Sequence, residues 1–199
     1  MSASNGLEYI EMIKPTFENA KAIQKLTLQD VEAGGFENPL ELADPFNTDK
    51  VISQRQKLRD HPERYSGYVR DGRLVAYIKQ NDWTITDELP FASRSRAVAI
   101  RASLGLHMSP STGQWGVFGL VASNDLNDEE REMVLRELLR SSFVDPRTSE
   151  PRTVNIAIHE RDPLFKIAVR LGFKAVGEIA EAAGAPGLMQ QRYQRSASN

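Results

Sequence analysis

A two-residue turn signal, Asp71-Gly72, stands between two runs of residues that favour β-strands. The runs cover 65–70 and 73–79. Asp-Gly favours a tight hairpin because both residues tolerate the positive φ angles that a type I′ turn requires. The sequence therefore predicts two adjacent antiparallel strands, and the rest of the chain has to pack on a sheet that contains them.

One strand and two helices are predicted before this hairpin. Polar and apolar residues alternate over 7–13 until Pro15, which is typical of a strand buried on at least one face. Thr16 can cap a helix whose apolar residues recur at helical spacing, before glycines break the chain. Asn47 or Thr48 can begin the second helix. The order to this point is strand, helix, helix, strand, strand.

The run 115–122, Trp-Gly-Val-Phe-Gly-Leu-Val-Ala, predicts the central strand of the sheet. Its two glycines leave places where another backbone or a ligand can approach closely. Asn127 is expected to begin a helix, because Glu130 follows it at the spacing of a capping box. This helix would bury one apolar stripe against the sheet.

The last part of the chain predicts a strand, a helix and two closing strands. The strand covers 153–158, and Asp162-Pro163 opens the helix with proline at a favoured first position. Gly172 ends that helix. The closing strands are expected at 174–179 and 188–194.

We interpret 81–110 as an insertion between the hairpin and the central strand. Five apolar residues recur there at strict two-residue spacing, which favours an inserted strand, with a short helix as the alternative. These residues are Val98, Ile100, Ala102, Leu104 and Leu106. An exposed edge strand would favour a homodimer. The insertion is also locally basic, so it could contact cofactor phosphates or an acidic partner, or it could simply be solvated; its basic residues are Arg94, Arg96, Arg101 and His107.

The totals point to one soluble globular domain over 1–199. The chain has 199 residues, of which 40% are hydrophobic and 26% are charged, enough for a core and a solvated surface. Cysteine is absent, which excludes disulfides and thiol catalysis and is compatible with a reducing compartment. We therefore expect a cytoplasmic protein.

Charge, hydropathy and histidine spacing disfavour nucleic acid, membranes and metal ions as partners of this chain. The formal net charge of -2 gives no broad basic surface for nucleic acid. No stretch approaches the roughly 20 apolar residues that span a bilayer, so no membrane association is expected. The three histidines show no paired metal-ligand spacing, so no metal site is expected.

The element order resembles that of the GNAT superfamily of acyl-CoA-dependent N-acyltransferases over nearly the whole chain. The closest local match is 164–173 (LFKIAVRLGF), whose ending Arg170-Leu171-Gly172-Phe173 is similar to the end of that family's fourth helix. The resemblance implies a mixed α/β fold. Its sheet, of about seven strands, would be dominated by antiparallel pairs and flanked by about four helices.

The resemblance also implies a site for acetyl-CoA. In such a site, main-chain groups of Gly119, Leu120 and Val121 would pair with the pantetheine arm and polarise the thioester carbonyl. The pyrophosphate would lie at the helix start near Asn127. The resemblance implies an amine of a small molecule or a peptide as the acceptor, which attacks the thioester directly after it loses a proton to a general base.

Two features depart from the family's pattern. The loop 123–131 corresponds to the family's phosphate loop, but it contains no glycine and carries several carboxylates at the helix start. Those carboxylates can satisfy the helix dipole themselves, so an ordinary capped surface helix is the competing interpretation. Alignment on Gly172 places Ala168 where the family usually has a tyrosine acid.

Other residues could take over the missing roles. His159 and Glu160, at the end of a strand beside the expected cleft, are candidate acid-base groups, because histidine titrates near neutrality. Arg161 could donate to the pyrophosphate, and Phe165 lies on the helix expected beside the cofactor. Each could equally be an ordinary surface or packing residue. The function expected is acyl-CoA-dependent N-acyl transfer, and the alternative is a GNAT-like domain without cofactor that serves as a binding module.

Overall fold

A computed structural model describes residues 6–32, 47–89, 91–159, 162–181 and 189–197. Contacts between residues divide the chain into two units, 1–80 with 118–141 and 81–117 with 142–199. The strand order is β1-β2-β3-β4-β5-β7-β6, and β3 (Arg73–Thr84) and β4 (Ser111–Ala122) run through both units. β4 pairs in parallel with β5, whereas the pairs β1–β2, β2–β3, β5–β7 and β6–β7 are antiparallel. The predicted mixed sheet dominated by antiparallel pairs is confirmed.

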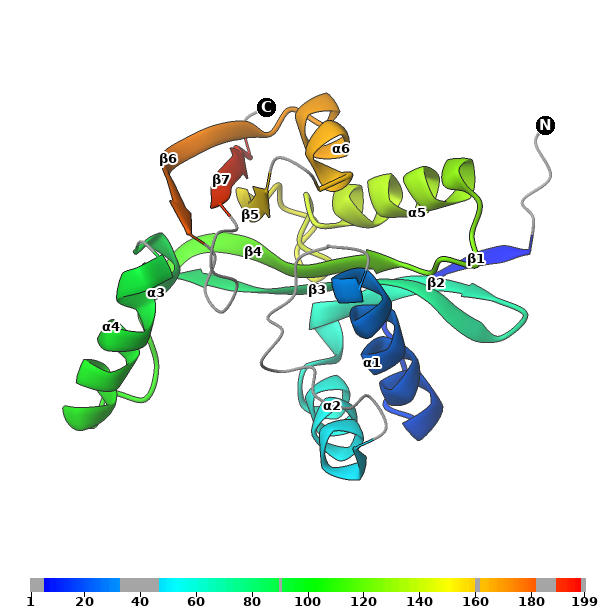
Figure 1. The fold of residues 1–199 in the computed structure, drawn as a ribbon, viewed down its shortest axis with the longest axis horizontal. Helices are drawn as coiled ribbons and strands as arrows, with labels where there is room; N and C mark the ends of the chain where they lie inside the picture. The colour runs from blue at the N-terminus through cyan, green and yellow to red at the C-terminus, as the bar shows by residue number, and fades with distance from the viewer. Residues whose placement is uncertain (1–5, 33–46, 90, 160–161, 182–188, 198–199) are drawn as a thin grey trace. The chain divides into compact units, whose positions relative to one another are not determined.

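The first unit contains the predicted hairpin. Its elements are β1 (Leu7–Ile10), α1 (Phe17–Glu32), α2 (Thr48–Asp60), η2 (Pro62–Arg64), β2 (Tyr65–Arg70), the first part of β3, the end of β4, and α5 (Asp128–Ser141). Asp71 and Gly72 have φ angles of 51° and 72°, as a type I′ turn requires. In this unit, α1 and α2 lie on one side of the strands and α5 lies on the other (Figure 1).

The two helix starts predicted before the hairpin are confirmed. The hydroxyl of Thr16 accepts the N–H of Asn19 at 3.1 Å, and the side-chain oxygen of Asn47 accepts the N–H of Asp49 at 2.9 Å. Each side chain thereby satisfies one of the amides that a helix start leaves without an internal partner. None of the described helices combines the length and the apolar composition needed to cross a membrane.

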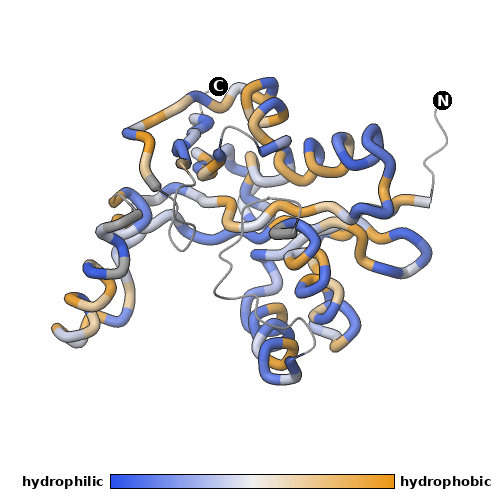
Figure 2. The backbone as a smooth tube through the Cα atoms, viewed as in Figure 1, coloured by the Kyte–Doolittle hydropathy of each residue, from blue (hydrophilic) through white to orange (hydrophobic). Residues whose placement is uncertain are grey.

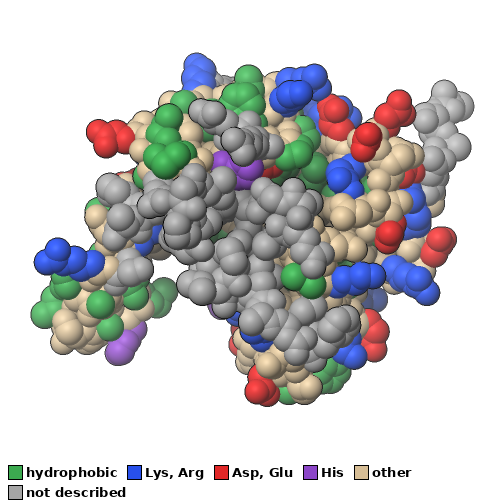
Figure 3. All heavy atoms as spheres, in the orientation of Figure 1, with side chains coloured by type: hydrophobic (Ala, Val, Ile, Leu, Met, Phe, Trp, Pro, Cys, Tyr) green, Lys and Arg blue, Asp and Glu red, His purple; other side chains and the backbone are tan. Residues whose placement is uncertain are grey.

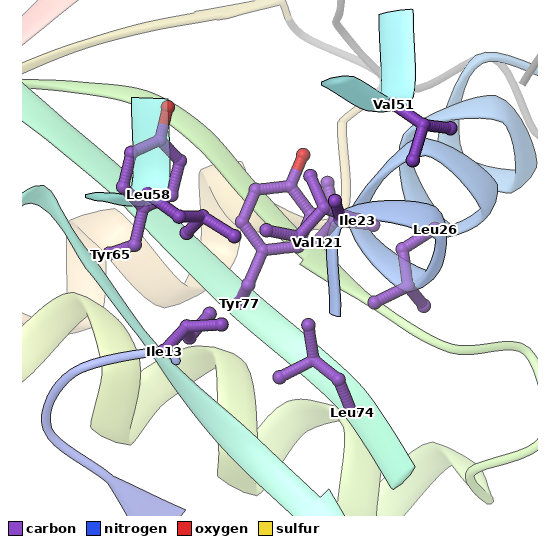
Figure 4. Packing of buried hydrophobic residues seen from close by; sticks show 10 residues of the cluster. Ile13, Ile23, Leu26, Val51, Leu58, Tyr65, Leu74, Tyr77 and Val121 are labelled. Carbon is purple, nitrogen blue, oxygen red and sulfur yellow. The ribbon is translucent and has the colours of Figure 1, made fainter. Parts of the chain in front are cut away.

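Residues from α1, α2 and three strands form the core of the first unit (Figure 4). Its buried members are Ile13, Ala20, Ile23, Leu26, Val51, Leu58, Tyr65, Leu74, Tyr77 and Val121. The Tyr77 hydroxyl lies 2.6 Å from the Thr27 hydroxyl, so this buried phenol has a hydrogen-bond partner. On the other side of the strands, α5 buries four of the five residues of its predicted apolar stripe, and this stripe faces the strands in Figure 2; the four are Val134, Leu135, Leu138 and Leu139. The fifth, Phe143, lies past the end of the helix and is half-buried.

The second unit contains the C-terminal strands. Its further elements are α3 (Ile85–Glu88), α4 (Phe91–Ser103), β5 (Val154–His159), α6 (Leu164–Arg170), β6 (Lys174–Glu181) and β7 (Met189–Arg195). β5 pairs with β7 over its whole length, from Val154↔Arg195 to His159↔Gln190. Gly172 has a φ of 85° at the end of α6, which confirms it as the residue that stops this helix.

The inserted strand expected within 81–110 is wrong, and the alternative of a short helix is correct. Residues 91–103 form α4, and Gly105 follows with a φ of 71°. Two-residue spacing on a helix spreads apolar side chains around its circumference, so they cannot share one buried face. The four large ones are accordingly about half exposed or more, with exposed fractions of 56% for Val98, 51% for Ile100, 68% for Leu104 and 49% for Leu106. Hydrophobic side chains lie at the surface over α4 in Figure 3. The argument for a dimer through an edge strand therefore lapses.

The two helices of the insertion also raise the number of flanking helices above the four expected. Two of its arginines hold the insertion together. The Arg94 guanidinium donates to the carbonyl oxygens of Asp87 and Leu89, and Arg101 donates to the carbonyl oxygen of Met108. Two of the four basic residues noted in the sequence thus donate to backbone carbonyl oxygens within the insertion.

Candidate functional site

β4 and β5 pair in parallel over three positions, from Trp115↔Val154 to Val117↔Ile156. An amide network fixes this paired segment. The Asn155 side-chain amide donates to Gln114 Oε1 at 2.8 Å, and the Gln194 amide donates to Gln114 Oε1 at 3.0 Å and to Asn155 Oδ1 at 3.1 Å. Asn155 is fully buried, so these bonds offset the cost of burying a polar side chain.

The predicted cofactor residues Gly119, Leu120 and Val121 lie near the end of β4, in the first unit. All three are buried, and the Val121 side chain belongs to the core of that unit. Directly after the strand, the Ser123 N–H donates to the carbonyl oxygen of Val75 at 2.7 Å. Because these side chains are committed to packing, a ligand at this segment would have to be recognised through main-chain groups.

Most backbone N–H groups of the loop 123–131, which follows β4, donate hydrogen bonds to acceptors within the chain. The Asp125 N–H donates to the Ser123 hydroxyl at 3.1 Å, and the Leu126 N–H donates to the Ser123 carbonyl at 3.3 Å. The Asn127 N–H donates to Glu130 Oε2 at 3.2 Å, and the Glu130 N–H donates to Asn127 Oδ1 at 2.9 Å. The capping box predicted at Asn127 is confirmed, and these amides are engaged as a capped helix start requires.

Two arginines compensate the acidic character of this loop. Arg70 on β2 donates to Glu130 Oε1 at 2.5 Å. The Arg131 guanidinium donates to the Ser123 carbonyl at 3.1 Å and to Asn124 Oδ1 at 2.6 Å. Sequence reasoning missed both arginines. Arg131 lies in the loop and could have been considered there, whereas Arg70 is distant in sequence and carries no local signal.

The candidate acid-base residue His159 is the last residue of β5 and is only 4% exposed. Its carbonyl oxygen accepts the N–H of Asp162 at 3.0 Å. Burial raises the pKa of the Asp162 carboxyl above its ordinary value, and the Leu164 N–H and the charge of His159 partly offset this rise. Sequence reasoning treated Asp162 only as the start of a helix and missed its electrostatic coupling to His159. Glu160, the other acid-base candidate, lies outside the described residues.

Solved structures with the same arrangement include acetyltransferases. An N-acetyltransferase from Staphylococcus aureus Mu50 matches with a TM-score of 0.62 and 12% sequence identity, over 96% of this chain and 98% of that chain. This chain has the GNAT fold. No protein-family profile matches the sequence, and no curated protein matches it.

Two further solved structures share the GNAT fold. The protein yncA from Salmonella typhimurium, assigned as an acetyltransferase and solved with acetyl-CoA, matches with a TM-score of 0.59 and 12% identity over 97% of this chain and 95% of that one. Aminoglycoside 6′-acetyltransferase type Ii matches with a TM-score of 0.58 and 12% identity over 96% and 97%. At these identities the likeness concerns the fold.

On the GNAT fold, α6 is the helix whose ending carries the local sequence resemblance. Ala168 is fully buried there, so the position aligned with the family's tyrosine acid holds a packing residue. The Phe165 ring meets the Tyr193 ring of β7 edge-on, with centroids 5.7 Å apart. Its predicted contact with a cofactor stays a prediction. Arg161, the candidate for the pyrophosphate, lies outside the described residues.

The tyrosines of the hairpin are packing residues in the GNAT fold of this chain. Tyr65 and Tyr77 are buried in the core of the first unit. The Tyr68 ring lies edge-on to Tyr9, with centroids 5.5 Å apart. Burial, followed by the negative charge of Glu137, raises the pKa of the Tyr68 phenol, which makes this residue a poorer proton donor at neutral pH.

Proposed function

We propose that the chain is an acyl-CoA-dependent N-acyltransferase that transfers an acetyl group to an amine of a small molecule or a peptide. The observation that carries this proposal is the GNAT fold over 96% of the chain, shared with an N-acetyltransferase over 98% of its length. A structure that contains acetyl-CoA is among those with the same fold, which supports the choice of cofactor.

In this proposal, main-chain groups near the end of β4 recognise the acyl-CoA. Main-chain groups of Gly119, Leu120 and Val121 would pair with the pantetheine arm, and a main-chain N–H among them would donate to the oxygen on which charge develops in the transition state. The buried side chains of Leu120 and Val121 hold this segment of backbone rigid, because they are packed in the first unit. Preorganised donors of this kind lower the barrier because they need no reorientation during the reaction.

The pyrophosphate of the acyl-CoA would not be bound by loop amides in the way that a glycine-containing phosphate loop binds it. Because the amides of Asp125, Leu126, Asn127 and Glu130 are bonded within the chain, they are not ready donors for a pyrophosphate. The start of α5, near Asn127, would contribute its helix dipole. Cationic side chains would supply the remaining attraction, and Arg161 is the residue we propose for this role.

His159 is the proposed general base, with Glu160 as the second candidate. It would take a proton from the acceptor ammonium, and the neutral amine would then attack the thioester carbonyl. The new carbon–nitrogen bond forms and the carbon–sulfur bond breaks, and the nitrogen gives up a second proton, which the departing thiolate takes up. Asp162 is the candidate to position His159, because its N–H donates to the His159 carbonyl oxygen.

The test measures acyl transfer through the thiol that it releases. The chain contains no cysteine, so a thiol-reactive dye reports only the coenzyme A that is formed. Purified chain is mixed with acetyl-CoA and a panel of primary amines, including peptides with free N-termini. Release of thiol that depends on both amine and chain, with an acetylated product 42 Da heavier by mass spectrometry, supports the proposal; the mass follows from replacement of one hydrogen by an acetyl group.

A second candidate function is a binding module that has the GNAT fold but no cofactor. The observation that favours it is the capped loop 123–131, with its internally bonded amides and its carboxylates Asp125, Asp128 and Glu129 exposed at the helix start. Carboxylates at that position repel a phosphate. Acetyl-CoA that leaves the melting temperature unchanged at millimolar concentration, together with no release of thiol, would favour this module over the enzyme.

A further inference from the structure

The second unit contains a cavity of about 350 Å³ that the GNAT resemblance does not assign. One wall comes from the insertion and the end of β3, and it comprises Trp83, Asp87, Glu88, Leu89 and Arg94. The other wall comes from the C-terminal strands, through Ala157, Arg192 and the segment 176–180. This volume is within the lower range of pockets that bind small molecules.

Two of the charged residues of this cavity have structural partners. Asp87 accepts hydrogen bonds from the backbone N–H and the hydroxyl of Thr84, both at 2.8 Å, and so caps α3. Arg94 donates to two backbone carbonyls of the insertion. These two side chains shape the wall, and recognition of a ligand has to come from other groups.

Arg192 and Glu88 form a loose charged pair at the wall of the cavity. Arg192 Nη1 lies 3.8 Å from Glu88 Oε1, which is within reach of charge attraction but too long for a hydrogen bond. The same Nη1 atom is buried and has no hydrogen-bond partner among the described residues. The Arg192 guanidinium also lies 6.0 Å from the centre of the Trp83 ring. Arg192 and Glu88 thus face the cavity beside an aromatic surface, and Glu178 of β6 adds a second carboxylate that can face a ligand's amine.

A buried amide lies next to Arg192 on the same face of β7. Arg192 and Ala157 are cross-strand partners that both line the cavity, and Gln190 follows two residues away, so its side chain is on that face. Gln190 is 1% exposed, and neither its amide nitrogen nor its amide oxygen has a hydrogen-bond partner in the part of the chain that is described. Gln190 itself is not one of the residues that line the cavity, so the polar contacts to a ligand have to come from Arg192 and the carboxylates of the lining.

We propose that this cavity binds an α-amino acid with an apolar side chain. The ligand's carboxylate pairs with Arg192 and its amine faces Glu88, so each charge of the loose pair gains a partner. The apolar side chain lies against Trp83 and Leu89. Binding follows from the second unit alone, whereas the further step, that this amine is the acyl acceptor, rests on the proposed function.

Three probes with the same hydrocarbon body test the assignment of charges. L-leucine carries both charges, 4-methylpentanoate lacks the amine, and 3-methylbutylamine lacks the carboxylate. Each is titrated by calorimetry into the full chain without acetyl-CoA. We expect leucine to bind about tenfold or more tightly than either analogue, because each lost charge-assisted hydrogen bond costs that much or more. Equal binding of all three, or no binding of leucine, would overturn the assignment.

Two variants separate the two contacts. Arg192→Gln should abolish the preference for leucine over 3-methylbutylamine, and Glu88→Gln should abolish its preference over 4-methylpentanoate. Lys174→Gln and Glu150→Gln are matched controls, since they remove the same charges at exposed sites of the same unit outside the cavity. If Arg192→Gln fails to fold, the exposed Glu88 still provides the decisive comparison. Preferences unchanged in Glu88→Gln would sink the proposal.

The outcomes for the cavity and for the transferase can be told apart. If leucine binds but no thiol is released from acetyl-CoA, the cavity assignment survives and the transferase proposal fails. If other amines are acetylated while leucine does not bind, the transferase survives and the cavity assignment fails.

Discussion

Arg70 on β2 and Glu130 on α5 form an ion pair of 2.5 Å that ties the predicted hairpin to the start of the helix after β4. The second oxygen of the Glu130 carboxylate accepts the N–H of Asn127. One carboxylate therefore serves both an ion pair and a capping box. Glu130, whose charge would repel a phosphate, therefore has a structural role at the start of α5.

Glu130→Gln should lower the free energy of unfolding by about 1 to 2 kcal/mol, because it removes a partly buried ion pair and weakens the cap. Glu129→Gln removes the same charge from the exposed neighbouring position and should change stability by less than about 0.5 kcal/mol. Urea unfolding of both variants measures the difference. Equal effects would show that the Arg70 contact contributes little.

Tyr77→Phe should destabilise the chain by about 1 kcal/mol, since the variant removes the hydroxyl that bonds to Thr27 inside the core. Tyr9→Phe makes the same chemical change at a residue that is 42% exposed and should be close to neutral. Thermal and urea unfolding provide the comparison. A neutral Tyr77→Phe would contradict the importance given to this hydrogen bond.

Asp162→Asn should change how stability depends on pH. The carboxyl pKa is raised above 3.8 in the folded chain, so the folded state holds more protons than the unfolded state between the two values. The stabilising contribution of the neutral carboxyl is full below the unfolded value and is lost as pH rises through the folded one. The variant should therefore gain stability relative to the natural chain over that window, as measured by urea midpoints at successive pH values. Asp128→Asn, which removes an exposed carboxylate, is the control, and a difference that does not vary with pH would refute the burial effect.

His159→Gln should lower kcat for acyl transfer by about 10²- to 10⁴-fold if the imidazole is the general base. The residue is buried, so the melting temperature has to be measured beside the rate to detect loss of structure. A pH–rate profile separates the roles, because loss of a base removes the limb that its titration creates, whereas a structural defect lowers the whole curve. Undiminished turnover would remove His159 from the mechanism.

Local patterns predicted the elements that local chemistry determines. Asp71-Gly72 gave the correct hairpin, Asn127 with Glu130 the correct cap, and Gly172 the correct helix end, because each depends on neighbours within a few residues. The insertion was wrong because two-residue spacing alone cannot distinguish a strand from a helix whose apolar residues face solvent.

The contacts at the candidate site and at the cavity could not be predicted from local patterns, because they join residues that are far apart in the sequence. Arg70 reaches Glu130 across 60 positions, and Arg192 approaches Glu88 across more than a hundred, so neither contact has a local signature. The burial of His159 and Asp162 depends likewise on the packing of whole elements. Asp162 was visible in the sequence only as a residue before proline, which conceals its burial.

The most direct test of the proposed transferase is titration of the full chain with acetyl-CoA while its melting temperature is followed. A ligand that binds the native state at 100 times its dissociation constant stabilises it by about 2.7 kcal/mol, which corresponds to roughly 5 to 10 °C for a domain of this size. We predict a rise that saturates with acetyl-CoA and is absent with free acetate. A melting temperature that stays constant up to millimolar acetyl-CoA would contradict the proposal that this chain uses an acyl-CoA.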